Sequence, residues 1–78
     1  MANQTHLRIL KQGVHVWNSW RHNKPFISPD LSGTNLMNWN LAGADFCNTN
    51  LDGADLRDAN LNGARFLGAS LEGTRGLV

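Results

Sequence analysis

The sequence predicts a mainly β repeat fold that is preceded by one helix, and three observations lead to this prediction. From Leu31 to Leu71, every fifth residue is leucine or phenylalanine. Two positions after each of these residues stands a glycine, asparagine or aspartate, which are residue types that favour turns. Ahead of the repeat, apolar residues recur at helical spacing. Neither a helix nor a flat strand has a period of five, so the pattern indicates a repeat architecture.

Residues 5–22 are predicted to form the helix. Asn3 or Thr5 is placed to cap its first turn, and Pro25 ends it because the residue before a proline disfavours helical geometry. Gly13 costs about 1 kcal/mol in the middle of a helix, so we expect a close backbone contact there. The apolar positions recur at intervals of three and four, namely Leu7, Leu10, Val14 and Trp17.

This helix is expected to cap the first coil of the repeat. The end of a repeat array exposes an apolar cross-section and an open backbone edge, which natural proteins cover with a capping element. Trp39 supports this position, because a tryptophan does not fit a small-residue column between two coils but fits on the first coil, under the helix. The predicted cap consists of Leu7, Leu10, Val14, Trp17 and Trp39.

Each five-residue unit reads small residue, polar residue, Leu or Phe, variable residue and turn residue. The chain bends once per unit, and between bends the Leu or Phe and the small residue share an inward face. Four sides per circuit close a square coil of about 20 residues, and stacked coils lie about 4.8 Å apart. The predicted core column is Leu31, Leu36, Leu41, Phe46, Leu51, Leu56, Leu61, Phe66 and Leu71.

The repeat resembles the pentapeptide-repeat family, whose unit centres on alanine, then aspartate or asparagine, then leucine. Clear copies here are Ala44-Asp45-Phe46, Ala54-Asp55-Leu56 and Ala59-Asn60-Leu61. The resemblance implies a right-handed quadrilateral β-helix, a solenoid of about two to two and a half coils. We divide the chain into residues 1–28, a capping helix with a proline-containing lead-in, and residues 29–78, the β-helix.

A circuit of 20 residues predicts which side chains lie above one another. Phe46 is expected directly under Phe66. Opposite charges on adjacent strands contribute about 0.2–1 kcal/mol each, and two such pairs fall at the same spacing, Asp45 with Arg65 and Asp55 with Arg75.

The charge is distributed unevenly along the chain. The formal net charge is +1 at pH 7. Residues 1–29 carry four basic residues and no acid, whereas residues 30–78 carry six acids against three arginines. The basic segment is a candidate surface for an acidic partner. Nucleic acid is not expected as a partner, because four charges over this length leave a poor electrostatic footprint.

The residue types that carry catalysis or bind metals do not form a recognisable constellation. His15 and His22 lie two turns apart on the predicted helix, too far for one metal ion. Cys47 has no histidine or acid placed to activate its thiol. We therefore predict a protein that is not an enzyme, with no catalytic, cofactor-binding or metal-binding residue, no cofactor and no small-molecule substrate.

Compartment and membrane association are predicted from two further observations. A single cysteine cannot form an internal disulfide, which fits a reducing compartment. Arg8, Lys11 and Gly13 interrupt any leader-like apolar run, and no run is long enough to span a membrane. The expected location is the cytoplasm, without membrane contact.

These features predict a non-enzymatic structural or protein-interaction module. The period decays after Gly73 without a recognisable cap, so self-association or docking to a larger assembly is expected through the uncapped C-terminal end or the flat coil faces. The candidate contact residues are apolar and lie in outward positions: Met37, Cys47, Leu67, Leu77 and Val78.

Two alternatives stay open. In the first, the chain is a fragment or accessory chain of a multi-domain signalling or defence protein. In the second, it is a DNA mimic that modulates gyrase, as are some members of the pentapeptide-repeat family that it resembles. Mimicry requires a long rod with strongly negative flanks, and the short repeat region here has an excess of only three acids.

Overall fold

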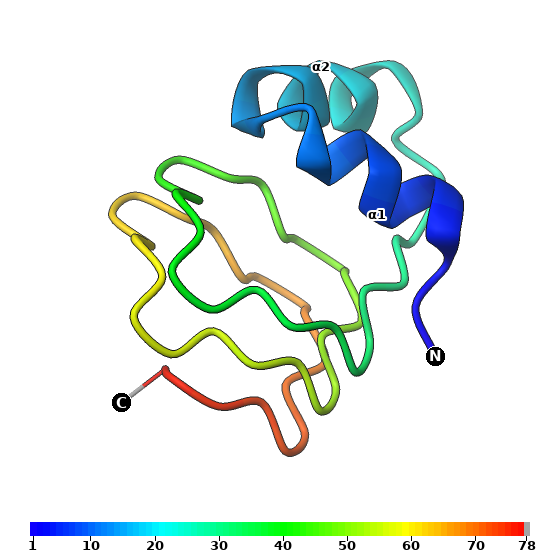
Figure 1. The fold of residues 1–78 in the computed structure, drawn as a ribbon. Coiled ribbons are helices and arrows are strands. Elements are labelled where there is room, and N and C mark those ends of the chain that lie inside the picture. Colours follow the sequence, from blue (N-terminus) through cyan, green and yellow to red (C-terminus); the bar gives the residue numbers. More distant parts are fainter. Residues whose placement is uncertain (78) are drawn as a thin grey trace.

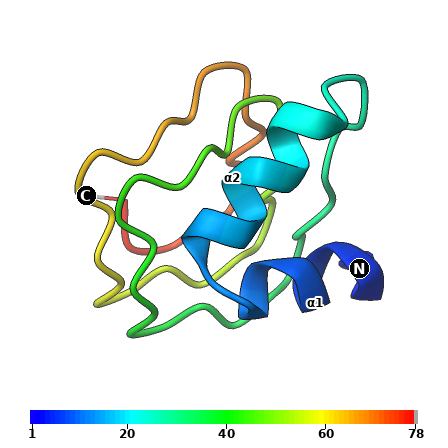
Figure 2. The ribbon, with the colours of Figure 1, turned by 90° about the horizontal axis from the view of Figure 1, so that it is seen from above.

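The computed structural model describes residues 1–77 as two short helices followed by a chain that turns every five residues (Figure 1). Helix α1 spans Gln4–Lys11 and helix α2 spans Val14–Asn23. Both helices lie over one end of the turning chain, and residues 70–77 lie at the opposite end. Seen from above, α2 crosses the middle of the turning chain and α1 lies along its side (Figure 2).

The prediction of one helix over residues 5–22 is wrong, because the chain breaks between α1 and α2. The N–H groups of Gln12 and Gly13 donate to the C=O groups of Ile9 and Leu10, which tightens the last turn of α1. Gly13 then has a φ of 113°, which L side chains rarely adopt. A β-carbon at Gly13 would meet nothing within 4 Å, so the expected close backbone contact is also wrong. The glycine is required by its φ angle.

The predicted helix ends are confirmed. Asn3 caps α1, since its Oδ1 accepts hydrogen bonds from the N–H groups of Thr5 at 2.9 Å and His6 at 3.1 Å. Helix α2 ends at Asn23, two residues before Pro25. These local signals were readable because caps and prolines act on their immediate neighbours.

Bridges in the repeat region are parallel and join residues 20 positions apart, which confirms the predicted spacing. We call residues 30–49 the first circuit, residues 50–69 the second circuit and residues 70–77 the start of the third. The bridges are Asp30↔Asn50, Asn35↔Asp55, Asn40↔Asn60, Asp45↔Arg65, Asn50↔Ser70 and Asp55↔Arg75.

The predicted mainly β quadrilateral β-helix is nevertheless wrong, and the terms β-helix and solenoid do not describe this chain. Each bridge is isolated, and no strand of two or more residues, sheet or barrel forms within residues 1–77. The physical reason is the density of corners. A positive-φ residue follows each Leu or Phe of the core column by two positions, as at Gly33 and Asn38, and the turn leaves too little extended chain for two consecutive bridges.

The core lies inside the circuits and continues up into the helices. Its aromatic members form a column of neighbouring rings, with centroids 5.2 Å apart for Trp20 and Trp17, 5.9 Å for Trp17 and Phe46, and 5.6 Å for Phe46 and Phe66. His6 of α1 packs on Trp20 at 5.1 Å. The column therefore ties both helices to both circuits.

Candidate functional site

The helices close one edge of the first circuit by imitating the hydrogen bonds of a further circuit. Inside the repeat, a bridging residue such as Asn60 donates its N–H to Trp39 C=O and accepts from Leu41 N–H. Asp45 in the first circuit makes the same two bonds to side chains of α2. Its N–H donates to Asn18 Oδ1 at 2.9 Å, and its C=O accepts from Trp17 Nε1 at 2.8 Å.

The same imitation occurs at Asp30, where the first circuit begins. The Asp30 N–H donates to His6 Nδ1 at 3.1 Å, and the Asp30 C=O accepts from Asn3 N–H at 2.9 Å. Asn18 adds a bond from its Nδ2 to Gly43 C=O at 2.9 Å. Because buried backbone groups need partners, these side chains stabilise an edge that would otherwise be exposed.

Arg21 fastens the segment that joins α2 to the first circuit. Its guanidinium donates to the C=O of Ile27 at 3.1 Å and to the C=O of Cys47. The side chain is nine-tenths buried, and its Nε has no partner among the described residues. Arg21 therefore holds two backbone segments side by side without direct contact to a carboxylate.

The opposite end of the chain exposes its core. The predicted core residues from Leu31 to Leu56 are fully buried, whereas Leu61 and Phe66 are half-buried and Leu71 is 37% exposed. We call Leu61, Phe66 and Leu71 the open face. It is the place where apolar side chains of the core column reach the surface.

The predicted cap residues lie at the helix-covered end. Leu10 and Trp17 are buried in the central apolar cluster, and Leu7, Val14 and Trp39 are half-buried and packed against that cluster. The aromatic rings that pack against Trp17 are those of Trp20 and Phe46, both tilted relative to it.

The predicted contact residues do not form one patch. Met37 lies beside Arg57, whose guanidinium donates to Met37 Sδ at 3.8 Å. Leu77 comes 20 residues after Arg57, so these three residues occupy one column of successive circuits. Leu67 lies below Cys47, since its C=O accepts from the N–H of Asn48. The two columns are half a circuit apart. Leu67 is 83% exposed, Met37 and Cys47 are half-buried, and Val78 lies outside the described residues.

One of the two predicted ion pairs is present. Arg65 lies 3.4 Å from the Asp45 carboxylate, as expected. Burial raises the pKa of Asp45, but hydrogen bonds from Cys47 and the charges of Arg21 and Arg65 outweigh it and hold the pKa below its ordinary value.

The predicted pair of Asp55 with Arg75 is replaced. The Asp55 carboxylate instead accepts from Arg57 at 2.7 and 2.9 Å. That hydrogen bond is the main cause that lowers the pKa of Asp55, with a smaller contribution from the charge of Arg75. A partner two residues away reaches the carboxylate more easily than one that must span two circuits.

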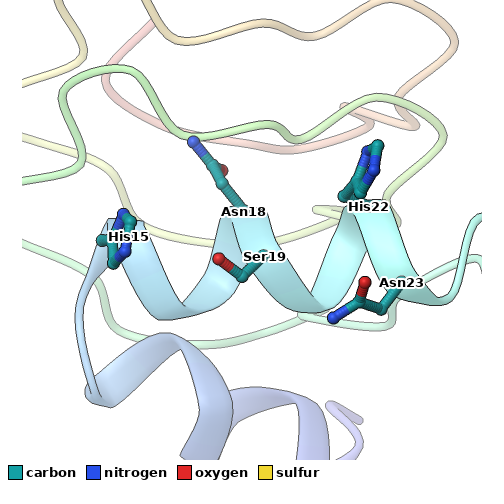
Figure 3. Close-up of a pocket in the computed structure, with 5 residues that line it drawn as sticks. All are labelled: His15, Asn18, Ser19, His22 and Asn23. Atoms are coloured by element: carbon teal, nitrogen blue, oxygen red, sulfur yellow. The ribbon is translucent and has the colours of Figure 1, made fainter.

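A shallow groove of about 380 Å³ lies along α2 (Figure 3). It is lined by polar side chains, namely His15, Asn18, Ser19, His22 and Asn23. Asn18 points from α2 toward the first circuit, where its amide is already bonded to Gly43 and Asp45. Over residues 1–77, no three His, Cys, Asp or Glu side chains are close enough to hold one metal ion.

Cys47 is poorly placed for chemistry. A hydrogen bond with Asp45 is the main cause that raises the pKa of its thiol, and burial and the Asp45 charge act in the same direction. A thiol with a raised pKa is a weaker nucleophile at neutral pH because less of it is ionised.

Sequence reasoning missed three polar residues that close the first circuit, His6, Asn18 and Arg21, and it predicted Asn3 only as a helix cap. Hydropathy does not mark them, because they act on backbone atoms. The sequence offers one signal, for Arg21, which comes four residues after Trp17 and therefore lies on the same helix face.

In the described part of the chain, neither helix has the length and apolar character needed to cross a membrane.

Comparison with known proteins gives one result. A family model described as pentapeptide repeats matches residues 40–75 with eight copies. Searches of curated proteins and of solved structures found no match. The matched range contains half of the first circuit, all of the second circuit and the three residues of the open face. This match confirms the resemblance noted from the sequence, since residues 40–75 carry pentapeptide repeats.

Proposed function

We propose that this chain is a non-enzymatic protein-interaction module that associates with a second copy, or docks onto a larger assembly, through its open face. The pentapeptide repeats indicate a structural or interaction module. The observation that carries the finer proposal is the exposure of the core along one column. Leu31 and Leu51 are fully buried, whereas Leu71 is 37% exposed.

Backbone groups support the same surface. In the first circuit, the N–H groups of Leu41 and Phe46 donate at 2.8 Å to carbonyls of the second circuit. The equivalent N–H groups of Leu61 and Phe66 have no backbone acceptor among residues 1–77. An apolar centre beside a row of free donors is what a further layer of protein would cover. Each square ångström of apolar area so buried contributes about 25 cal/mol.

The carboxylates support a non-enzymatic role, because the fold already uses them. Asp45 Oδ1 accepts from Cys47 N–H at 3.0 Å, and Asp55 Oδ1 accepts from Arg57 N–H at 3.1 Å. Asn50 makes the same bond to the residue two positions later. These side chains recur because each stabilises its own turn.

Light scattering across a concentration series tests the proposal. We expect the wild-type chain to form a dimer or larger species, and a Leu61→Glu, Leu71→Glu double variant to be monomeric. Phe26→Glu is the matched control, because Phe26 is exposed outside the open face. A wild-type monomer at all concentrations, or an assembly that survives the double substitution, would contradict self-association here. So would a gene that continues the five-residue period and covers the open face from the same chain.

A further inference from the structure

Two large apolar side chains outside the open face are almost completely exposed. Phe26 is 98% exposed and lies in the segment that joins α2 to the first circuit. Leu67 is 83% exposed and lies in the second circuit. Isolated exposed apolar residues are ordinary on protein surfaces, whereas neighbouring ones mark interaction sites. The two residues gain significance only if they belong to one surface.

Hydrogen bonds place their backbones in consecutive rows on one side of the molecule. The Arg21 guanidinium donates to the C=O groups of both Ile27 and Cys47, so these residues lie within the reach of one side chain. The N–H of Asn48 then donates to Leu67 C=O at 2.9 Å. The rows are thus the Phe26 segment, the Cys47 row and the Leu67 row. Figures 1 and 2 both show the joining segment beside this side of the circuits.

The joining segment is held in place. The N–H of Ile27 donates to Lys24 C=O at 3.2 Å, and its C=O is held by Arg21. Pro25 and Pro29 restrict the backbone on either side. An ordered turn that exposes a whole phenylalanine gives up the roughly 1.5–3 kcal/mol that burying the ring would contribute, and the fold shows no use for it.

The charges around this surface are mainly positive. Lys24 is exposed, stands two residues before Phe26, and forms no salt bridge within the described chain. Arg65 stands two residues before Leu67, and its side chain is 66% exposed. Asp45 is the carboxylate nearest to Arg65, at 3.4 Å. A cationic rim around apolar side chains favours a partner with the opposite charge.

We propose that Phe26, Ile27 and Leu67 form a docking site for a short acidic peptide segment of another protein, in which apolar side chains are flanked by carboxylates. The apolar side chains would cover Phe26 and Leu67, and the carboxylates would meet Lys24 and Arg65. Large apolar side chains at the centre with charges at the rim are the usual anatomy of a binding site. This site is separate from the open face and does not rest on self-association.

A peptide fits the surface better than an anionic membrane does. The Asp45 carboxylate lies within the site, beside Arg65, and a flat anionic bilayer would bring its headgroups against that carboxylate. An extended peptide is narrow enough to meet Lys24 and Arg65 separately.

Selection from a displayed library of random 12-residue peptides tests the proposal. We expect the wild-type chain to enrich sequences with two or more large apolar residues flanked by Asp or Glu. Binding of an enriched peptide should fall about tenfold or more in each of Phe26→Ser and Leu67→Ser. It should also weaken as salt is raised, because exposed charges are screened. Val16→Ser, which removes a partly exposed apolar side chain from α2, is the matched control and should bind as the wild type does.

Amide chemical shifts then locate the bound peptide and test the fold of each variant. Shifts are expected in residues 24–28, 47–49 and 67–69. The proposal is overturned if selection enriches nothing over the Phe26→Ser, Leu67→Ser double variant, if the enriched peptides are basic or uncharged, or if the shifts fall on the open face. Binding to phosphatidylserine vesicles without binding to any peptide would overturn it in favour of a lipid surface.

Discussion

The two ends of the turning chain meet the same physical problem with different means. At the helix-covered end, the N–H and C=O groups of Asp30 and Asp45 are bonded to His6, Asn3, Asn18 and Trp17. At the open face, the N–H groups of Leu61 and Phe66, whose counterparts Leu41 and Phe46 bond the next circuit, have no backbone partner inside the described range. Side chains on a helix can therefore replace a layer of backbone, provided that a donor and an acceptor reach the same residue.

Replacing Trp17 should give the largest effect, because this residue joins the helices to the circuits. Its ring is fully buried between Trp20 and Phe46, and its Nε1 bonds Asp45 C=O. Trp17→Ala should lower the free energy of unfolding by about 3–5 kcal/mol, measured by urea unfolding.

The matched change at the other end is Phe66→Ala, which removes a half-buried ring from the same aromatic column. It should cost clearly less than Trp17→Ala, because part of the Phe66 ring is already in contact with water. Equal costs would mean that the open face is as well covered as the helical end, and the comparison between the ends would fail.

Replacing Asn18 tests whether imitation of a circuit stabilises the edge. Asn18→Ala removes an acceptor from Asp45 N–H and a donor from Gly43 C=O. We expect a loss of about 1–3 kcal/mol and faster hydrogen exchange at the Asp45 amide. Asn23→Ala, which changes an exposed residue at the end of α2, is the control. Unchanged exchange at Asp45 would show that water serves this edge as well as the amide does.

The His6 contact makes the capped end sensitive to pH. Burial lowers the pKa of His6, although the charge of Asp30 acts in the opposite direction. Its Nδ1 accepts from Asp30 N–H and must be unprotonated to do so. Because the folded pKa is below the ordinary value near 6.5, the unfolded chain binds the proton more readily. The His6 contact therefore contributes its full stabilisation above the ordinary pKa. This stabilisation is lost as the pH falls from there toward the folded pKa.

Chemical unfolding at pH 7.5 and at pH 5 measures this effect. The wild-type chain should lose stability between the two values, and His6→Gln should lose much less of it. His15→Gln, on the exposed side of α2, should keep the wild-type pH dependence. The lowered pKa values of Asp45 and Asp55 act at lower pH, because their contributions are lost only below the ordinary carboxyl pKa near 3.8. A wild-type stability that does not change across this range would rule out the His6 contact as a stabilising element.

The sequence was most informative where a feature repeats. The period of five predicted the 20-residue spacing, and with it the stacking of Phe46 on Phe66 and the pair of Asp45 with Arg65. Spacing carries this information because every unit repeats the same backbone geometry. It does not show how long the chain stays extended between corners. The spacing therefore could not predict that the bridges are isolated and form no sheet within the described residues.

Features that occur once were harder to predict. Gly13 was interpreted as a packing position, but its positive φ ends α1. The contacts of Asn18 and Arg21 were not predicted, because a side chain that bonds the backbone differs from a solvated one only in its three-dimensional surroundings. Asp55 had two arginines within reach, and the register alone could not show that it bonds Arg57.

The smallest effect is expected at Arg65, whose contact with Asp45 spans the two circuits on the surface. Arg65→Ala should lower the free energy of unfolding by only about 0.2–1 kcal/mol, because an exposed ion pair replaces the favourable hydration of two charges by their contact with each other. The difference from wild type should shrink in 1 M salt. A loss comparable to that of Asn18→Ala would mean that surface charges, as well as the helical cap, hold the first circuit on the second. The contrast between a side-chain cap and an open end would then be incomplete, because the circuits would also be joined along their outer sides.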